Sequence, residues 1–494
     1  MNTKYLFVSG GVVSGLGKGI TTASIALLLK SAGFKVSPMK IDMYLNIDAG
    51  TIRPQEHGEV FVTEDGLETD EDLGHYERFL NEDLNRANYT TTGQVYSEVI
   101  RKERAFEYGG EDVEAIPHLT DEIIRRIKLA GESRKAEIVL IELGGTVGEY
   151  QNAIFFEANR IMKLKNPRDV FHLHLAYLPF LKSIGELKSK PVQTSVHILN
   201  SMGIQPDFIF TRSEKVVDKR RRERLALFCN VLDEDIIDNP DVESVYEVPL
   251  NFERQGFTQK LLKKIGLKGQ ANLKSWEEKV LEIKKAKKEV KIGIVGKYFA
   301  TGDFTLSDSY VSVVEALKHA GAFLGVLPKL FWIDSETIEK KGTGVLQEFS
   351  GIIVPQGWGS RGVEGKIQTI QYCREKKVPY LGLCFGMQMA VIEFARNVCH
   401  LKNANTTEAD PKTLYPVIDI MPDQVEYLKK HQYGGTIRLG AWPCKLVKET
   451  KTAECYKNLQ ISERHRHRYE FNNKYRELME KKGLIISGVS PDGK

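Results

Sequence analysis

The chain has 494 residues, of which 41% are hydrophobic and 28% are charged, and its formal net charge is +4. That length suits two or three domains, and the composition is that of an ordinary soluble globular protein. The nearly balanced charge gives no sign of a nucleic-acid-binding protein, and no stretch approaches the ~18 apolar residues of a membrane span. We therefore expect neither nucleic acid nor a membrane as a partner.

The cysteines indicate the compartment. Six of them are widely spaced and form no Cys-x-x-Cys pair. This spacing argues against a zinc site and against a disulfide framework, and it suits a reducing cytoplasm. The apolar run at the start ends at Gly10, which is too early for a signal peptide. We expect a cytoplasmic protein.

Apolar strands alternate with helical patterns along two parts of the chain. In residues 1–265, the expected strands and helices are 5–9, 21–32 (helix), 35–41, 121–129 (helix), 138–142, 170–175 and 207–211. A second pattern of this kind starts at 291 and includes strands at 351–355 and 378–383. Both patterns predict an α/β fold with mainly parallel sheets. The Lys- and Glu-rich stretch 272–288 predicts a linker helix, with a solvated helix inside one domain as the alternative.

A glycine-rich turn follows the first strand and precedes a helix. Such a turn points backbone N–H groups at a bound anion, and Lys18 adds a positive charge. Gly19 stands where a phosphate loop usually has a hydroxyl residue that helps to hold Mg²⁺. Asp72 and Glu142 are the acids that could replace it. A dinucleotide-type turn is the alternative, but Gly-Leu-Gly-Lys-Gly before a helix favours a nucleoside triphosphate.

Cys384 lies in a Gly-x-Cys-x-Gly turn between an apolar strand and a helix. This is the cysteine form of a nucleophile elbow, in which the helix N-terminus lowers the thiol pKa and N–H groups hold an oxyanion. The alternative is a buried small hydrophobic residue. A cysteine nucleophile needs a histidine base. The later histidines are His400, His431, His465 and His467, and none is in a His-x-Glu arrangement.

Many runs of residues together resemble one family, that of CTP synthases. The most specific runs are 10–21, 40–42, 46–51, 56–66, 72–79, 142–148, 188–191, 226–230 and 464–470. The resemblance implies a phosphate-loop-type amidoligase domain at 1–265, a linker helix at 266–290, and a class I glutamine amidotransferase domain at 291–494. Each domain is then expected to be a mainly parallel sheet flanked by helices.

The resemblance also implies the reaction and the ligands. ATP is the co-substrate that phosphorylates O4 of UTP, and ammonia, either free or released from glutamine, displaces the phosphate to give CTP. The implied cofactor is Mg²⁺, the allosteric activator GTP and the inhibitor CTP. A homotetramer, and filaments built from it, are also implied.

The resemblance assigns site residues by their position in the matching motifs. Cys384 and Lys18 take the catalytic roles, and Asp72 and Glu142 hold Mg²⁺. The ATP residues are Gly15, Leu16, Gly17, Lys18, Gly19, Ile20, Lys40, Asp72, Pro240, Asp241 and Val242. The UTP or CTP residues are Ser14, Glu149, Tyr150, Gln151, Lys188, Ser189, Lys190, Pro191, Val192, Gln193 and Arg224. The glutamine residues are Gly357, Phe385, Gly386, Met387, Gln388, Glu408 and Arg468.

The sequence departs from the family at several of these positions. The family has a His-Pro-Glu segment beyond the motif of Arg468, and the printed sequence ends at Lys494 without it, so the second domain is expected to be incomplete. We expect little glutamine-dependent activity from this polypeptide but CTP formation from free ammonia. Gln151 stands in place of a family Glu, which predicts altered feedback inhibition by CTP. Arg224 replaces a Lys, and Gly15 replaces a Ser.

Two other readings of the sequence remain open. One is a different phosphate-loop ligase with a fused amidotransferase, such as an enzyme that acts on a cobalamin precursor. The other is a regulatory or structural homologue that binds nucleotides without glutaminase activity. ATP hydrolysis that requires both UTP and ammonium chloride would separate these readings from a CTP synthase.

Overall fold

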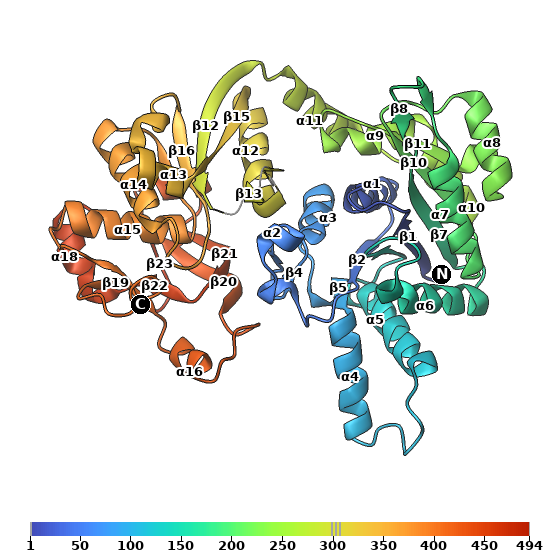
Figure 1. Ribbon diagram of the computed structural model, residues 1–494, viewed down its shortest axis with the longest axis horizontal. Helices are drawn as coiled ribbons and strands as arrows, with labels where there is room; N and C mark the ends of the chain where they lie inside the picture. The colour runs from blue at the N-terminus through green and yellow to red at the C-terminus, as the bar shows by residue number, and fades with distance from the viewer. Residues whose placement is uncertain (1, 298–299, 302–303, 306–307, 494) are drawn as a thin grey trace. The chain divides into compact units, whose positions relative to one another are not determined.

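The structure is a computed structural model that describes residues 2–297, 300–301, 304–305 and 308–493 (Figure 1). It divides into two compact units. The first unit comprises Met1–Ala49 and Asp72–Val280, and the second comprises Gly50–Glu71 and Leu281–Lys494. This division departs from the expected boundaries in one segment, because residues 50–71 group with the second unit.

The first unit contains the following strands and helices. Its strands are β1 (Lys4–Gly10), β2 (Val36–Asp42), β5 (Tyr89–Thr91), β6 (Ile138–Leu143), β7 (Val170–Tyr177), β8 (Phe180–Leu181), β9 (Glu186–Leu187), β10 (Phe208–Ser213) and β11 (Ile236–Pro240). Its helices are α1 (Lys18–Ser31), α3 (Asp72–Leu80), α4 (Thr92–Arg104), α5 (Thr120–Ser133), α6 (Ala153–Lys165), α7 (Lys190–Ser201), α8 (Lys219–Cys229), α9 (Val248–Arg254) and α10 (Phe257–Ile265). Helix α11 (Lys274–Lys285) crosses the boundary at 280 and confirms the expected helix at 272–288.

The main sheet of the first unit is parallel, in the strand order β11-β10-β7-β1-β6-β2-β5. The five expected strands correspond to β1, β2, β6, β7 and β10. They were recognisable because a strand buried on both faces is a continuous apolar run. Side chains of α4, α5 and α6 form a core against one face, while α1 packs against α3 and α9 (Figure 1).

The strand order places a ligand site at one end of this sheet. β1 lies between β6 and β7, and the chain leaves β1 through α1 to β2, on the far side of β6. The order therefore reverses at β1. In open α/β sheets, ligands bind at the carboxyl ends of the strands beside such a reversal. The glycine-rich loop begins at this end of β1.

The second unit contains the following strands and helices. Its strands are β3 (Phe61–Val62), β4 (Glu68–Thr69), β12 (Lys288–Gly296), β13 (Ala300–Thr301), β14 (Phe304–Thr305), β15 (Val326–Asp334), β16 (Gly351–Val354), β17 (Tyr380–Gly382), β18 (Asn405–Thr406), β19 (Pro416–Ile420), β20 (Arg438–Leu446), β21 (Gln460–His467), β22 (Tyr469–Phe471) and β23 (Gly488–Val489). Its helices are α2 (Pro54–His57), α12 (Val311–Leu324), α13 (Ser335–Lys341), α14 (Val363–Lys376), α15 (Phe385–Asn397), α16 (Gln424–Lys429), α17 (Lys451–Tyr456) and α18 (Arg476–Lys481).

A parallel sheet in the order β15-β12-β16-β17 forms the centre of the second unit. Helices α14 and α15 contribute buried side chains to its core, as do β16 and β19. The smaller sheet β21-β20-β23 is antiparallel. The expected α/β class, with a mainly parallel sheet in each part, is confirmed. Within the described part of the chain, no helix is both long and apolar enough to span a membrane.

Candidate active sites

The glycine-rich loop connects β1 to α1 in the first unit. Gly15 and Gly17 have positive φ angles of 71° and 85°, which a residue without a Cβ adopts at little cost. Helix α1 begins directly at Lys18, so the free N–H groups of its first turn are available to an anion. The Lys18 ammonium donates to the carbonyl oxygen of Gly145, 2.8 Å away.

The structure explains why glycine occupies position 19. A Cβ atom built there would overlap Oδ1 of Asp72, the first residue of α3. A side chain at position 19 would therefore require the Asp72 carboxylate to turn away from α1. The Asp72 carboxylate lies beside position 19, at which other phosphate loops carry a hydroxyl residue.

Three charged side chains meet next to this point. The Lys40 ammonium, at the end of β2, pairs with Asp72 Oδ2 and lies 3.3 Å from Glu142 Oε1 on β6. The hydroxyl of Tyr76 donates to Glu142 Oε2. Burial and the neighbouring Asp72 raise the pKa of Glu142 to about 7, while Lys40, Lys18 and the Tyr76 hydrogen bond oppose the rise.

This cluster has the composition of a Mg²⁺ site. Three carboxylates lie near a single ammonium, since Asp42 Oδ1 is also 3.7 Å from Lys40 Nζ, and hard divalent ions prefer carboxylate oxygens. In the protein alone, Lys40 offsets part of this negative charge. Lys18 is held by Gly145 at the other side of the loop, and burial lowers its pKa. The structure thus brings together Lys18, Gly19, Lys40, Asp72 and Glu142.

The residues expected at the adenine lie at the end of β11. Pro240 ends that strand, and Asp241 pairs with Arg212 at 2.6 Å. The preceding Asn239 donates to the hydroxyl of Thr21 on α1, 3.3 Å away. The segment 240–242 therefore lies near the helix that follows the phosphate loop.

The residues expected to bind UTP are less closely grouped. Gln193 on α7 is buried and donates to the Ser189 hydroxyl at 3.0 Å. The two lysines of this segment face elsewhere: Lys190 is exposed, and Lys188 pairs with Glu186. The guanidinium of Arg224 lies 5.6 Å from the centre of the Phe228 ring.

The segment expected to recognise the cytosine or uracil base follows β6. Glu149 accepts hydrogen bonds from the backbone and the hydroxyl of Thr146, at 2.8 and 2.6 Å. Tyr150 is 93% exposed, and Gln151 is also exposed. Both side chains are thus accessible to a ligand, and their roles stay predictions.

Cys384 occupies the elbow between β17 and α15. Its φ and ψ angles are 50° and −105°, a strained conformation for a residue with a side chain. Both flanking glycines are required by close packing. A Cβ at Gly386 would overlap the carbonyl oxygen of Val354, and one at Gly382 would lie 2.7 Å from the Met387 nitrogen. The predicted sharp turn between a strand and a helix is present, and the nucleophile role of Cys384 stays a prediction.

The environment of the thiol differs from the expected one in one respect. The residue is exposed, but protein atoms crowd the sulfur, and this desolvation raises the pKa of Cys384 to about 11. The N–H of Phe385, at the start of the helix, lowers it by a smaller amount. The expectation of a lowered pKa is therefore wrong for this structure, because desolvation outweighs the helix N-terminus. The sulfur also lies 3.8 Å from the carbonyl oxygen of Arg466.

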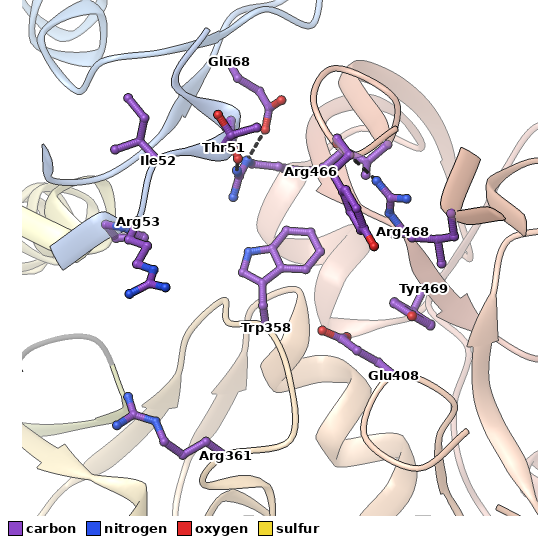
Figure 2. Close-up of a pocket in the computed structure, with 15 residues that line it drawn as sticks. Thr51, Ile52, Arg53, Glu68, Trp358, Arg361, Glu408, Arg466, Arg468 and Tyr469 are labelled. Carbon is purple, nitrogen blue, oxygen red and sulfur yellow. Dashed lines mark hydrogen bonds and ion pairs between the residues drawn. The ribbon is translucent and has the colours of Figure 1, made fainter. Parts of the chain in front are cut away.

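A pocket of about 630 Å³ opens within the second unit (Figure 2). Its lining includes Glu408 and Arg468, two of the residues expected to bind glutamine. Glu408 accepts a hydrogen bond from the Gly359 N–H at 2.6 Å, and burial raises its pKa. Arg468 is buried, and its Nη2 donates to Thr436, while its Nη1 has no partner among the residues that the structure describes. A buried guanidinium nitrogen of this kind suits a carboxylate ligand.

The other residues expected to bind glutamine lie around the elbow. Gln388 is buried and donates to the carbonyl oxygen of Tyr469 at 2.8 Å, and Phe385 is fully buried. Met387 is 44% exposed. Gly357 follows β16, and its backbone lies against Phe385.

Sequence reasoning missed several residues of this pocket. Trp358, Arg361, Tyr433 and Arg466 line it, together with Gly50–Pro54 and Glu68 from the segment that groups with the second unit. Figure 2 shows the Trp358 ring next to Arg466, whose guanidinium lies 5.4 Å from the ring centre and pairs with Glu68 at 2.7 Å. Trp358 directly follows Gly357, so its position in the motif was an available signal.

The two histidines on β21 form a pair of their own. His465 Nδ1 lies 2.9 Å from His467 Nε2, and His467 Nδ1 lies 3.0 Å from the carbonyl oxygen of Tyr469. Burial lowers the pKa of both rings, to about 4 in His467. With these partners they are not assigned as the base for Cys384.

Comparison with known families identifies both parts of the chain. The family model described as CTP synthase N-terminus matches residues 4–267, and the model described as glutamine amidotransferase class-I matches residues 305–494. A CTP synthase of Caldanaerobacter subterraneus is 51% identical over 99% of this chain and 90% of its own length. The chain belongs to the CTP synthase family.

A second curated member of the CTP synthase family gives the same result. A CTP synthase of Pyrococcus abyssi is 51% identical over 99% of this chain and 90% of its own length. Among solved structures, the glutaminase domain of a Trypanosoma brucei CTPS with bound acivicin is 36% identical, covering 42% of this chain and 77% of that one, with a TM-score of 0.38. The family match at 4–267 includes residues 50–71, although these residues pack in the second unit.

Proposed function

We propose that this protein catalyses the ATP-dependent amination of UTP to CTP, a ligase reaction that forms a C–N bond. The observation that carries the proposal is the cluster of Lys18, Lys40, Asp72 and Glu142 at the start of α1. Membership of the CTP synthase family supports the choice of substrates. The alternative of a non-catalytic homologue has no observation in its favour.

In the proposed reaction, the first unit mainly positions groups and neutralises charge. The carbonyl oxygen at C4 of UTP is a poor leaving group until it is phosphorylated. Backbone N–H groups at the start of α1, with Lys18 and Lys40, would orient the ATP phosphates. Asp72 and Glu142 would hold Mg²⁺, which neutralises the charge that builds up in phosphoryl transfer. Because the pKa of Glu142 is about 7 in the protein alone, ion binding near neutral pH would release a proton from it.

The second unit would supply ammonia from glutamine. The sulfur of Cys384 would form a bond to the carboxamide carbon, and the N–H groups of Gly357 and Phe385 would hold the oxyanion. Arg468 would bind the α-carboxylate through its unpartnered Nη1. Free ammonia would replace this step.

Further properties come from the family resemblance. We propose GTP as an allosteric activator of glutamine hydrolysis, feedback inhibition by CTP, a homotetramer that forms filaments, and a cytoplasmic location. The exposed Gln151 supports altered inhibition by CTP, because an amide replaces the carboxylate that would accept from the cytosine amine. An inhibition curve identical to that of Gln151→Glu would contradict this part.

The test of the proposed function is CTP formation with ammonium chloride as the nitrogen source. We expect ATP hydrolysis that depends on both UTP and ammonium, with one CTP formed for each ATP consumed. The Cys384→Ser variant should keep this activity, because it alters only the glutamine reaction. ATP hydrolysis without UTP, or no CTP at any ammonium concentration, would contradict the proposal.

A further inference from the structure

Lys366 on α14 is a lysine in an unusual position. Its side chain is fully buried, with 0% exposure, and its Nζ has no hydrogen-bond partner among the residues that the structure describes. Nζ lies 4.7 Å from the centre of the Phe385 ring. A Cβ at Gly357 would lie 3.2 Å from Nζ, so the amine rests against the backbone of that glycine.

A second buried lysine near the same ring provides a contrast. Lys297, which directly follows β12, has its Nζ 5.2 Å from the centre of the Phe385 ring. It donates to the carbonyl oxygens of Gly359 and Arg361, each 3.2 Å away, and to that of Trp358. The ammonium of Lys297 is therefore hydrogen-bonded to the backbone, whereas the amine of Lys366 has no such acceptor among the described residues.

The charged and titratable groups around Lys366 come from four parts of the second unit. They are Lys297 after β12, Arg361 before α14, Cys384 before α15 and Glu408 after β18. Burial and Lys297 lower the pKa of Lys366 to about 7, whereas Glu408 and Cys384 act to raise it. The amine can thus gain or lose its proton near neutral pH, and negative charge at Cys384 favours the protonated form.

Burying an amine without partners destabilises a fold. Such a group loses its hydration and gains no hydrogen bond in return, and an apolar side chain of similar size is often at least as stable in its place. Lys366 also abuts Gly357 and Phe385, the two residues whose N–H groups face the oxyanion in the proposed glutamine reaction. A role in that reaction would account for the retention of the lysine.

We propose that Lys366 is a positioning residue that stabilises the thiolate of Cys384. Its ammonium, which lies against Gly357 and the Phe385 ring, would supply the compensating positive charge. In this step the S–H bond of Cys384 breaks and its proton passes to solvent water. The negative charge on the sulfur then favours the ammonium form of Lys366, which balances it. The inference rests on the proposed glutaminase role of Cys384.

The test is the rate at which iodoacetamide alkylates Cys384, followed by mass spectrometry across pH 6–10. Only the thiolate reacts, so the rate reports the thiol pKa without glutamine turnover. We expect Lys366→Met to lower the rate at pH 8 by about tenfold, because a nearby opposite charge shifts a pKa by at least about one unit. Lys366→Arg keeps a positive charge, so its alkylation rate at pH 8 should fall by less.

The matched control is Lys376→Met, which changes an exposed lysine of the same helix. It should leave the alkylation profile unchanged. Thermal unfolding separates an electrostatic role from a structural one, since Lys366→Met should be as stable as the parent or more so. A near-isosteric neutral variant, Lys366→Gln, provides the same test if the methionine variant folds poorly.

An unchanged alkylation profile in Lys366→Met, or in Lys366→Gln, would overturn the inference. A large loss of stability in both variants would overturn it as well, because it would show a structural role. Failure of the proposed function is a separate result. It appears as absent CTP formation with ammonium chloride, a reaction that does not use Cys384.

Discussion

Replacing Gly19 by alanine should damage the first unit, although glycine normally weakens a helix. A Cβ at this position would overlap Oδ1 of Asp72. Either α3 shifts or the Asp72 side chain turns away from Lys40, and overpacking of this kind costs about 1–3 kcal/mol. At roughly 2–4 °C per kcal/mol for a unit of this size, the unfolding midpoint should fall by about 2–12 °C.

The same substitution should act in the opposite direction once Asp72 is shortened. In an Asp72→Ala background the overlapping atom is gone, and alanine near the start of α1 should stabilise the helix by about 0.5–1 kcal/mol. The two substitutions should therefore show a coupling energy of about 1.5–4 kcal/mol in a double-mutant cycle. Thermal unfolding of the parent, the two single variants and the double variant measures it.

The double-mutant cycle also tests why this phosphate loop has no hydroxyl residue. Gly19→Ser, which supplies the hydroxyl that the usual motif has at this position, should lose amination activity with ammonium chloride, since it displaces the carboxylate proposed to hold Mg²⁺. If Gly19→Ala lowered the midpoint equally with and without Asp72, the steric explanation would be refuted. Full activity of Gly19→Ser would refute it as well.

Three further predictions concern buried polar groups. Tyr76→Phe removes a hydrogen bond that lowers the pKa of Glu142, so the acid limb of the amination pH profile should move to higher pH; an unshifted limb would contradict this. Burial lowers the pKa of His174 from 6.5 to about 3. The free energy of unfolding should therefore fall by up to about 1.4 kcal/mol for each pH unit below 6.5. Urea unfolding at pH 7 and 5 measures this loss, and His174→Asn should show less of it. Arg468→Met should raise the glutamine concentration that protects Cys384 from iodoacetamide by at least about tenfold, and equal protection would remove Arg468 from the glutamine site.

Local sequence patterns were sufficient for the parallel strands and for the elbow. β1 and β6 contain continuous apolar runs, at 5–8 and 138–141, because both faces of these segments are covered. The glycines around Cys384 are required by the short distances to Val354 and Met387. Although the contact of Gly386 with Val354 joins two separate elements, the apolar runs and the spacing of the glycines each lie within a short stretch of the chain. They are therefore visible in a single sequence.

Long-range packing was not visible in the same way. Nothing in residues 50–71 shows that they pack with the second unit, because that depends on partners such as Arg466, far along the chain. From the sequence alone Lys366 would be taken for a surface lysine, but the structure buries it completely. The pKa of Cys384 was misjudged for the same reason, because a motif shows the helix N-terminus but not the atoms that desolvate the sulfur.

The central claim is that the loop before α1 holds a triphosphate whose terminal group is transferred to UTP. Its most direct test is CTP formation by Lys18→Ala with ATP, UTP, Mg²⁺ and saturating ammonium chloride, with Lys340→Ala, which changes an exposed lysine, as the control. We predict that Lys18→Ala loses at least about a hundredfold in rate, while the control keeps the parent rate. CTP formation by Lys18→Ala at the parent rate would contradict the account.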